Sequence, residues 1–141
     1  MRQAVEPARR PELNRALSNA VGHCYHRCTG RGPAKAQTFY QRDVVVVVLH
    51  GTLTVAERTL ISDGRKDAVQ RLRAAMHEAM TAELADAVQA LTGCQVLAAM
   101  SSDDVARDIA AELFLLEAPR SDQRDVSPES VARNMRRPIS T

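Results

Sequence analysis

The residues of this sequence best suited to chemistry form a short loop rich in glycine and basic side chains. Gly30, Arg31, Gly32 and Lys35 lie within six positions of one another. Backbone N–H groups beside glycines, together with arginine and lysine, are typical partners of phosphate or carboxylate groups. His50 follows an apolar run and could titrate near neutral pH. One hypothesis is therefore a small anion-binding site made of these five residues.

A purely structural interpretation of the same loop competes with the anion site. Phosphate-binding loops usually follow a strand and open a helix, whereas this loop ends a helix and precedes a strand. Gly30 suits the left-handed position that ends many helices, and Pro33 prevents the helix from continuing. The sequence favours a helix stop and turn over a phosphate loop.

A histidine and cysteine cluster, His23, Cys24, His26 and Cys28, resembles a metal site at first inspection. Zinc needs four ligands that converge on one point, but neighbouring positions on a helix diverge by about 100° per residue. Cys24 and Cys28 also continue an apolar stripe, so we interpret them as small buried apolar residues. We predict no metal and no cofactor.

Serine and aspartate residues at 101–104 carry hydroxyl and carboxylate groups, but no base is placed to activate a serine. Turn formation explains this segment better. Since no convergent catalytic set is visible, we expect that the protein is not an enzyme.

Apolar periodicity predicts the elements that position these residues. They are, in chain order, a helix from Leu13 to Thr29, strands over 37–41 and 44–49, helices over 54–62 and 65–92, and strands over 94–100 and 109–117. The stretch 106–117 also has helical character, but its alternation favours a strand. Thr54 and Glu57 fit a capping box at a helix start.

The order helix, hairpin, helices, hairpin predicts an α+β fold. We expect a two-layer sandwich with one long helix on a mostly antiparallel four-stranded sheet. The run of five valines from Val44 to Val48 has no polar alternation, so we expect a central strand covered on both faces.

We predict the individual residues that form the apolar stripe of the first helix and of the long helix. One consists of Leu13, Leu17, Val21, Cys24 and Cys28; the other consists of Val69, Leu72, Met76, Met80, Leu84, Val88 and Leu91. Both repeat every three or four positions, the spacing of one helix face. We expect both stripes to face the core.

Length and composition limit the number of domains and the classes of binding partner that we expect. The 141 residues favour one domain, at 12–118, with a flexible leader at 1–11 and a disordered tail at 119–141. The net charge is only +2, and its positive excess lies in the two ends, which argues against binding of nucleic acid other than weak association through these tails. No signal sequence or membrane span is visible, which predicts a cytoplasmic protein.

Several pieces of the chain together resemble one family. They are Gly30–Pro33 with Lys35 and Ala36, the valine-rich strand that closes in Gly51, the Leu53–Glu57 cap, and the long helix that ends in Gly93. Their order and spacing over about 12–117 are similar to the MpsC family of small bacterial proteins. Val55 stands where that family commonly has proline.

The resemblance implies a soluble component of a Na⁺-translocating, membrane-potential-generating system, and it supplies no catalytic residues to transfer. We therefore expect an accessory or regulatory protein that acts through protein–protein contacts with transporter subunits at the inner face of the membrane. The apolar stripe that includes Met76 and Met80 is longer than one small sheet can cover, so we also expect a homodimer that forms through the long helix or a sheet edge. The alternatives are a sensor of small ligands or anions, and weak association with nucleic acid.

Overall fold

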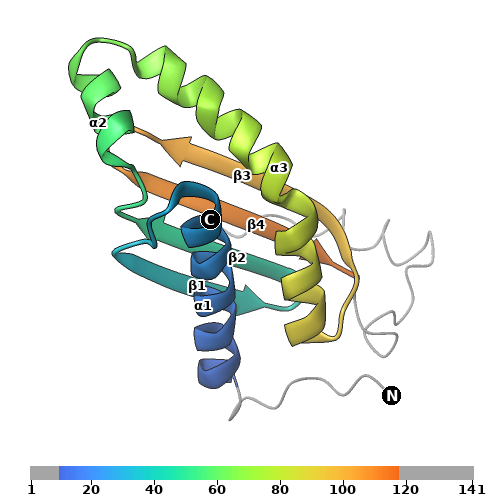
Figure 1. Ribbon diagram of the computed structural model, residues 1–141. Helices are drawn as coiled ribbons and strands as arrows, with labels where there is room; N and C mark the ends of the chain where they lie inside the picture. Colours follow the sequence, from blue (N-terminus) through green and yellow to red (C-terminus); the bar gives the residue numbers. More distant parts are fainter. Residues whose placement is uncertain (1–9, 118–141) are drawn as a thin grey trace, which may run out of the picture.

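Two long helices lie on one face of a four-stranded sheet, and a short helix packs against one of them, in residues 10–117, the part of the chain that the computed structural model describes (Figure 1). The elements are α1 (Arg10–Thr29), β1 (Lys35–Gln41), β2 (Val44–His50), α2 (Val55–Ser62), α3 (Lys66–Thr92), β3 (Val96–Asp104) and β4 (Ile109–Leu116). This arrangement confirms the predicted α+β two-layer sandwich. Helix α1 begins inside the predicted leader, and the rest of that leader and the predicted tail lie outside the described residues.

The sheet has the strand order β1-β2-β4-β3, and every neighbouring pair is antiparallel. Both predicted hairpins are confirmed, as is the central place of β2. The predicted turn at 101–104 is wrong, because β3 continues to Asp104 and the chain reverses over 105–108. Ser101 pairs with Glu112 in this extension, and both side chains lie on the helix side of the sheet.

The valine strand β2 is buried on one face only. Val45, Val47 and Leu49 are fully buried, whereas Val44, Val46 and Val48 are half-buried. Our prediction that both faces are covered is wrong, because α1 and α3 both pack on the same side of the sheet and α2 packs against α3. The outward valines are shielded mainly by their neighbours on β1 and β4.

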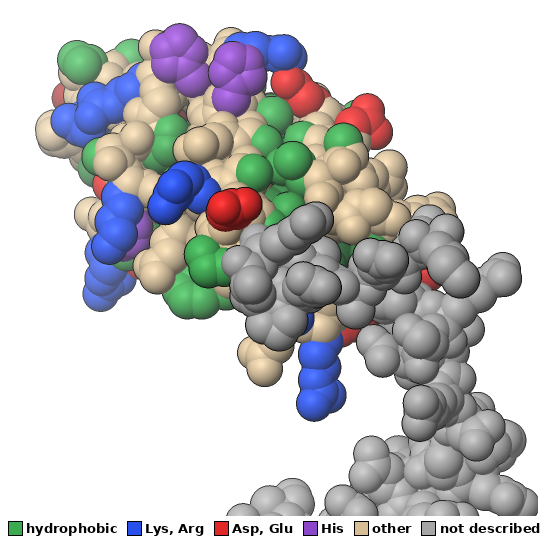
Figure 2. All heavy atoms as spheres, turned by 90° about the horizontal axis from the view of Figure 1, so that it is seen from below, with side chains coloured by type: hydrophobic (Ala, Val, Ile, Leu, Met, Phe, Trp, Pro, Cys, Tyr) green, Lys and Arg blue, Asp and Glu red, His purple; other side chains and the backbone are tan. Residues whose placement is uncertain are grey.

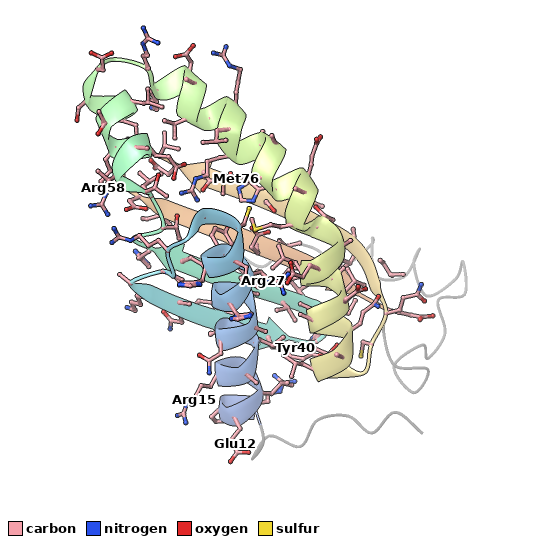
Figure 3. The ribbon with its side chains drawn as sticks, viewed as in Figure 1. Glu12, Arg15, Arg27, Tyr40, Arg58 and Met76 are labelled. Atoms are coloured by element: carbon pink, nitrogen blue, oxygen red, sulfur yellow. The ribbon has the colours of Figure 1, made fainter. Side chains whose placement is uncertain are left out.

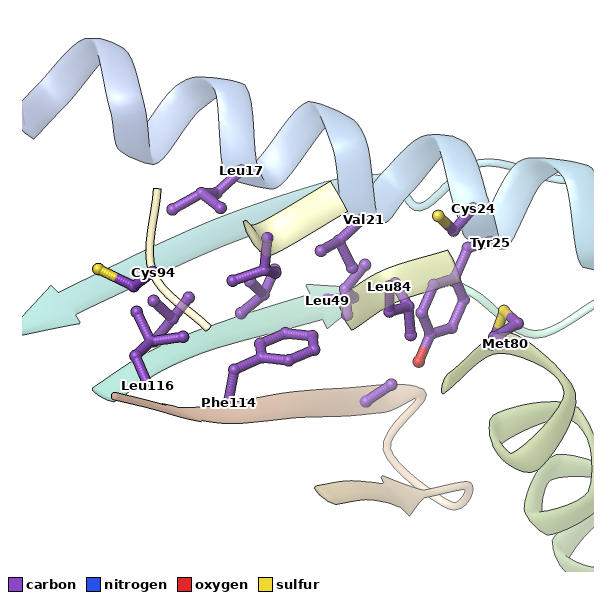
Figure 4. Packing of buried hydrophobic residues seen from close by; sticks show 14 residues of the cluster. Leu17, Val21, Cys24, Tyr25, Leu49, Met80, Leu84, Cys94, Phe114 and Leu116 are labelled. Atoms are coloured by element: carbon purple, nitrogen blue, oxygen red, sulfur yellow. The ribbon is translucent and has the colours of Figure 1, made fainter. Parts of the chain in front are cut away.

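The main core lies between the helices and the inner face of the sheet (Figure 4). Its fully buried side chains include Leu17, Val21 and Tyr25 from α1, Leu84 and Val88 from α3, and Val45, Val47, Leu49 and Phe114 from the sheet. Aliphatic residues fill most of this space because the chain has few aromatics. A second, smaller cluster of Leu53, Val69 and Val105 packs under α2.

The ends of the helices follow the local sequence. Thr54 caps α2 in a complete capping box: its side chain accepts from the Glu57 N–H, and Glu57 accepts from the Thr54 N–H. Gly93 ends α3 in the left-handed conformation, with φ of 70°.

The helix stripes differ from the prediction at three positions. Cys28 is exposed, and Tyr25 takes the buried place at that end of α1. On α3, Leu72 and Leu91 are exposed, while Arg73 and His77 are buried. The first half of α3 therefore turns two ionisable side chains, and not a leucine, toward the sheet.

Candidate functional site

In the predicted anion loop, backbone groups already form hydrogen bonds with the loop itself and with the end of α1. Gly30 has φ of 78°, and its N–H donates to the His26 carbonyl at 2.8 Å, as expected of a residue that ends α1. The backbone N–H of Arg31 donates to Thr29 Oγ1 at 3.1 Å, and the same hydroxyl donates to the Arg31 carbonyl. These bonds use backbone groups that an anion would need.

A shallow hollow of about 420 Å³ lies between α1 and the start of β1. Gly32 and Lys35 line it together with His23 and His26 of α1, whereas Arg31 and His50 do not. Histidine and basic side chains lie side by side on the surface seen in Figure 2. The hollow lies along the carboxyl-terminal half of α1, so the negative end of the helix dipole is the nearer one, which opposes binding of an anion.

His50 belongs to a different part of the surface. The register pairs Lys35 with His50, and both alternate with residues that face the core, so their side chains lie on the outer side of the sheet. The structure therefore brings Lys35 and His50 together but separates His50 from the glycines. The five predicted residues do not form one convergent site.

A buried ion pair between Arg73 and Glu57 is the first of the polar contacts that sequence reasoning missed. Arg73 is 1% exposed and Glu57 is 2% exposed. Arg73 Nε donates to Glu57 Oε2 at 2.6 Å, and Nη2 donates to Oε1 at 2.7 Å. Thr52 accepts from the same guanidinium through its hydroxyl and its carbonyl. All three nitrogens of the guanidinium are thus engaged, which such deep burial requires.

His77, one turn further along α3, lies between two carboxylates from the sheet. Its Nε2 pairs with Asp103 of β3, and its Nδ1 lies 3.1 Å from Glu112 Oε1 of β4, without the angle of a hydrogen bond. The Tyr25 hydroxyl donates to Glu112 at 2.7 Å, and Ser101 donates to the other oxygen. Figure 4 shows the Tyr25 hydroxyl pointing from α1 toward the sheet.

We call this set the buried polar network: Thr52, Glu57, Arg73, His77, Ser101, Asp103, Glu112 and Tyr25. It links α1, α2, α3 and both strands of the second hairpin. Arg73 Nη1 lies 3.9 Å from Asp103 Oδ1, which joins the arginine part to the histidine part. Three carboxylates face one guanidinium and one imidazole, so the network holds excess negative charge.

The pKa values follow from these neighbours. Burial lowers the pKa of His77, but Asp103 and Glu112 outweigh it and raise the pKa to about 9. Burial favours a higher pKa for Glu57, yet the bonds from Arg73 and Thr54 hold that pKa below its ordinary value. Burial, followed by the charge of Glu112, raises the pKa of the Tyr25 hydroxyl far above its usual range. At neutral pH, His77 is therefore an imidazolium.

This arrangement is suited to holding elements together and to holding a proton. The Ser101 hydroxyl is bonded to a carboxylate and not to the histidine, so it lacks the neighbouring base of an activated nucleophile. Asp103 and Glu112 lie at opposite nitrogens of the His77 ring, and the three do not converge on one point. Consistently, no group of metal-ligating side chains in residues 10–117 has the geometry to hold a metal ion.

One signal in the sequence could have indicated the network. Val69, Arg73, His77, Met80, Leu84 and Val88 repeat every three or four positions and are all buried. The buried stripe of α3 is thus continuous when Arg73 and His77 are counted among its inward-facing residues. For Glu57 the sequence indicated only the capping box. Its ion pair depends on Arg73, which lies 16 positions away.

The outer face of the sheet carries exposed apolar side chains from more than one strand. Met100 is 61% exposed and Phe39 is 52% exposed. Cross-strand pairing aligns Phe39, Val46, Leu113 and Met100 in one row across all four strands. We define the outer sheet face by its apolar members: Phe39, Val44, Val46, Val48, Ala98, Met100, Ile109, Ala111, Leu113 and Leu115.

Comparison with known proteins gives one match. The family model described as Na⁺-translocating membrane potential-generating system (MpsC) matches residues 9–118. The match covers every residue that the structure describes. No curated protein and no solved structure gives a significant match. Among residues 10–117, no helix has the length and apolar character needed to span a membrane.

Proposed function

Because this chain belongs to the MpsC family, we propose that it is an accessory or regulatory protein of a Na⁺-translocating membrane system and acts through protein–protein contacts. The family supplies the link to such a system. In this proposal the ion-translocating chemistry belongs to partner subunits, the chain works on the cytoplasmic side of the membrane, and it is not an enzyme.

The outer sheet face is the observation that carries the contact role. Large apolar side chains exposed together on one surface usually mark a site of interaction. Here they lie on a sheet, a rigid element, and within the residues matched by the family. The charged groups of the buried polar network, in contrast, bind one another and leave little capacity for a substrate. Contact with proteins is therefore the function that this geometry supports best.

The expected partners are of two kinds. One is a membrane subunit that translocates Na⁺, which the family description suggests. The other is a second copy of this chain, since we also propose the homodimer expected from the sequence.

Co-purification tests the membrane partner. The full chain, carrying an affinity tag, is expressed at its native level and recovered from membranes in mild detergent. We expect an integral-membrane subunit of a cation-translocating complex to be recovered in stoichiometric amount. The reciprocal experiment, with the tag on that subunit, should recover this chain. Recovery of the chain without any membrane subunit, in both directions, would contradict the proposal.

A second candidate function is an anion sensor built on the hollow that Lys35, Gly32, His23 and His26 line. His23 and His26 line this hollow from α1, and Lys35 stands at its rim where β1 begins, which favours this alternative. Inorganic phosphate and acetate serve as probes in a thermal unfolding series at constant ionic strength. A saturable rise in Tm that Lys35→Ala abolishes would support the sensor, and an equal rise in the variant would contradict it.

A further inference from the structure

The two edges of the sheet are poorly suited to pairing with another chain. On the β1 edge, Arg10 Nη1 donates to the carbonyl of Tyr40, which is labelled in Figure 3, at 3.1 Å, so one backbone acceptor is already occupied. On the β3 edge, the register shifts between Val96 and Ala98, which is typical of a β-bulge. Bulges and charged side chains are the usual devices that protect edges from strand addition. Association by a continuous sheet is thus disfavoured at both ends.

The outer sheet face carries no comparable protection at its centre. Its row of Phe39, Val46, Leu113 and Met100 has no charged member. The next row toward the β1–β2 turn adds Val44, Leu115 and Ala98. Among the paired residues of the four strands that face outward, charge appears only at the opposite end, where the row Lys35, His50, Ile109, Asp104 crosses the sheet. The face is therefore an apolar area with a basic corner on β1 and an acidic corner on β3.

We propose that this face binds the same face of a second copy, with a twofold axis parallel to the strands between β2 and β4. Rotation about that axis places β1 over β3 of the partner and β2 over β4. Phe39 then lies over the partner's Met100, and Val46 lies over the partner's Leu113. The inference rests on the homodimer of the proposed function and specifies its surface.

Charge complementarity selects this axis over the other one that the face allows. With the axis parallel to the strands, Lys35 lies opposite the partner's Asp104, and the symmetric pair forms at the other edge. An axis across the strands would instead place Lys35 opposite the partner's Gln41 and leave Asp104 over an alanine. Lys35 is exposed, and Asp104, although bonded to Arg107, keeps 41% of its side-chain surface exposed.

The area of the outer sheet face determines how strongly the two copies are expected to bind. Four strands of about seven residues cover about 19 by 23 Å, given the usual spacings between strands and along them. This projected area, about 440 Å² on each copy, is smaller than that of a standard stable interface and is typical of weak, transient ones. Two twisted sheets can pack in this way at about 30° with their side chains interdigitated. The dimer should therefore form readily at high protein concentration and dissociate on dilution.

Sedimentation velocity of the full chain over a wide concentration range measures the dimer. Phe39→Lys and Met100→Lys should each raise its dissociation constant by at least tenfold, in the range of interface hot spots. Both side chains are exposed in one copy, so the variants should remain folded. Leu72→Lys is the matched control, because Leu72 is 46% exposed on α3 in the other layer. It should leave the dissociation constant unchanged.

Charge reversal tests the axis. Lys35→Glu should weaken the dimer roughly threefold or more, and adding Asp104→Lys should restore it. A carbodiimide joins only carboxylate and amine groups in direct contact. Within one copy, Lys35 and Asp104 lie on opposite edges, about 14 Å apart by strand spacing. A Lys35–Asp104 cross-link between ¹⁵N-labelled and unlabelled copies is thus expected.

Three results would overturn the inference. A monomer at every concentration would mean that something other than a second copy covers the outer sheet face. A dimer unaffected by Phe39→Lys and Met100→Lys would place the interface elsewhere. A dimer lost in Leu72→Lys would place it on the helices. None of these outcomes depends on recovery of a membrane subunit, so failure here is distinguishable from failure of the membrane role.

Discussion

Arg73 and Glu57 form a bidentate ion pair that solvent hardly reaches, with N–O distances of 2.6 and 2.7 Å. The pair joins α3 to the first turn of α2, and the same glutamate completes the α2 capping box. One carboxylate therefore has both a local and a tertiary role. The pair also positions the start of α3, which places His77 over the sheet.

Arg73→Met should destabilise the fold by about 3–5 kcal/mol, because it leaves Glu57 buried without a counter-charge. Chemical denaturation monitored by circular dichroism measures the change. Arg71→Met is the matched control: Arg71 pairs with Asp67 on the same helix, but both are largely exposed. Its effect should stay below about 0.5 kcal/mol.

A double variant, Arg73→Met with Glu57→Leu, distinguishes the energy lost with the ion pair from the cost of leaving one charge buried and unpaired. The double variant should be more stable than the sum of the two single changes predicts, since it leaves no unpaired buried charge. Additive changes would contradict the coupling that the structure shows.

Stability should fall as the pH rises from about 6.5 to about 9. In this window the unfolded chain has released the His77 proton, whereas the folded chain retains it between Asp103 and Glu112. The contribution is complete below pH 6.5 and is lost as the pH passes through the folded-state pKa. Its size is on the order of 2–3 kcal/mol. Urea denaturation at several pH values measures this slope.

His77→Gln should remove most of that slope, although it also lowers stability at pH 6. His26→Gln is the control, because His26 is exposed on α1. A His77→Gln protein that retains the full slope would show that another group binds the proton.

Asp108→Ala should cost about 1–3 kcal/mol, because two backbone donors lose their acceptor. Asp108 Oδ1 accepts from the N–H groups of Thr52 and Leu53 at 2.8 and 3.1 Å, and its φ is 53°. Asp108→Asn keeps the carbonyl acceptor and tolerates a left-handed backbone. It should therefore retain most of the stability in the same denaturation assay. Equal losses in both variants would contradict this role for Asp108.

Gly51→Ala should destabilise the fold more than Gly93→Ala does. Both glycines have φ of 70°, so each substitution carries a similar backbone cost of about 1 kcal/mol. Only at Gly51 would the new Cβ meet another atom, the Cβ of Ala34, at 2.8 Å. The excess should be about 1–3 kcal/mol. Similar Tm values for the two variants would show that the Ala34 segment moves aside freely.

Local chemistry explains why much of the fold could be predicted from the sequence. Thr54 and Glu57 mark a helix start three residues apart, and Gly93 marks a helix end, so no distant partner is needed to recognise them. The tight turn at Arg42 and Asp43 likewise separates two β-branched runs. The valine run identified the central strand, but not that its outer side lacks a helix, because valine suits a half-buried strand as well as a buried one.

The buried polar network could not be predicted in the same way. Arg73 and His77 are buried only because carboxylates from other elements meet them, and those partners are 16 to 35 residues away. Charged residues taken alone are expected in solvent. The same cause explains the error at 101–104: Ser101 and Asp103 looked like turn residues, yet both face inward in a strand.

The most direct test of the proposed role in a Na⁺-translocating system is the Na⁺-dependent membrane potential of cells that lack this protein. A voltage-sensitive dye reports the potential with and without external Na⁺, in the parent strain, in the deletion strain, and after complementation. We predict that the Na⁺-dependent part is reduced in the deletion strain and restored by the wild-type chain and by Leu72→Lys. An unchanged Na⁺-dependent potential in the deletion strain would contradict this role.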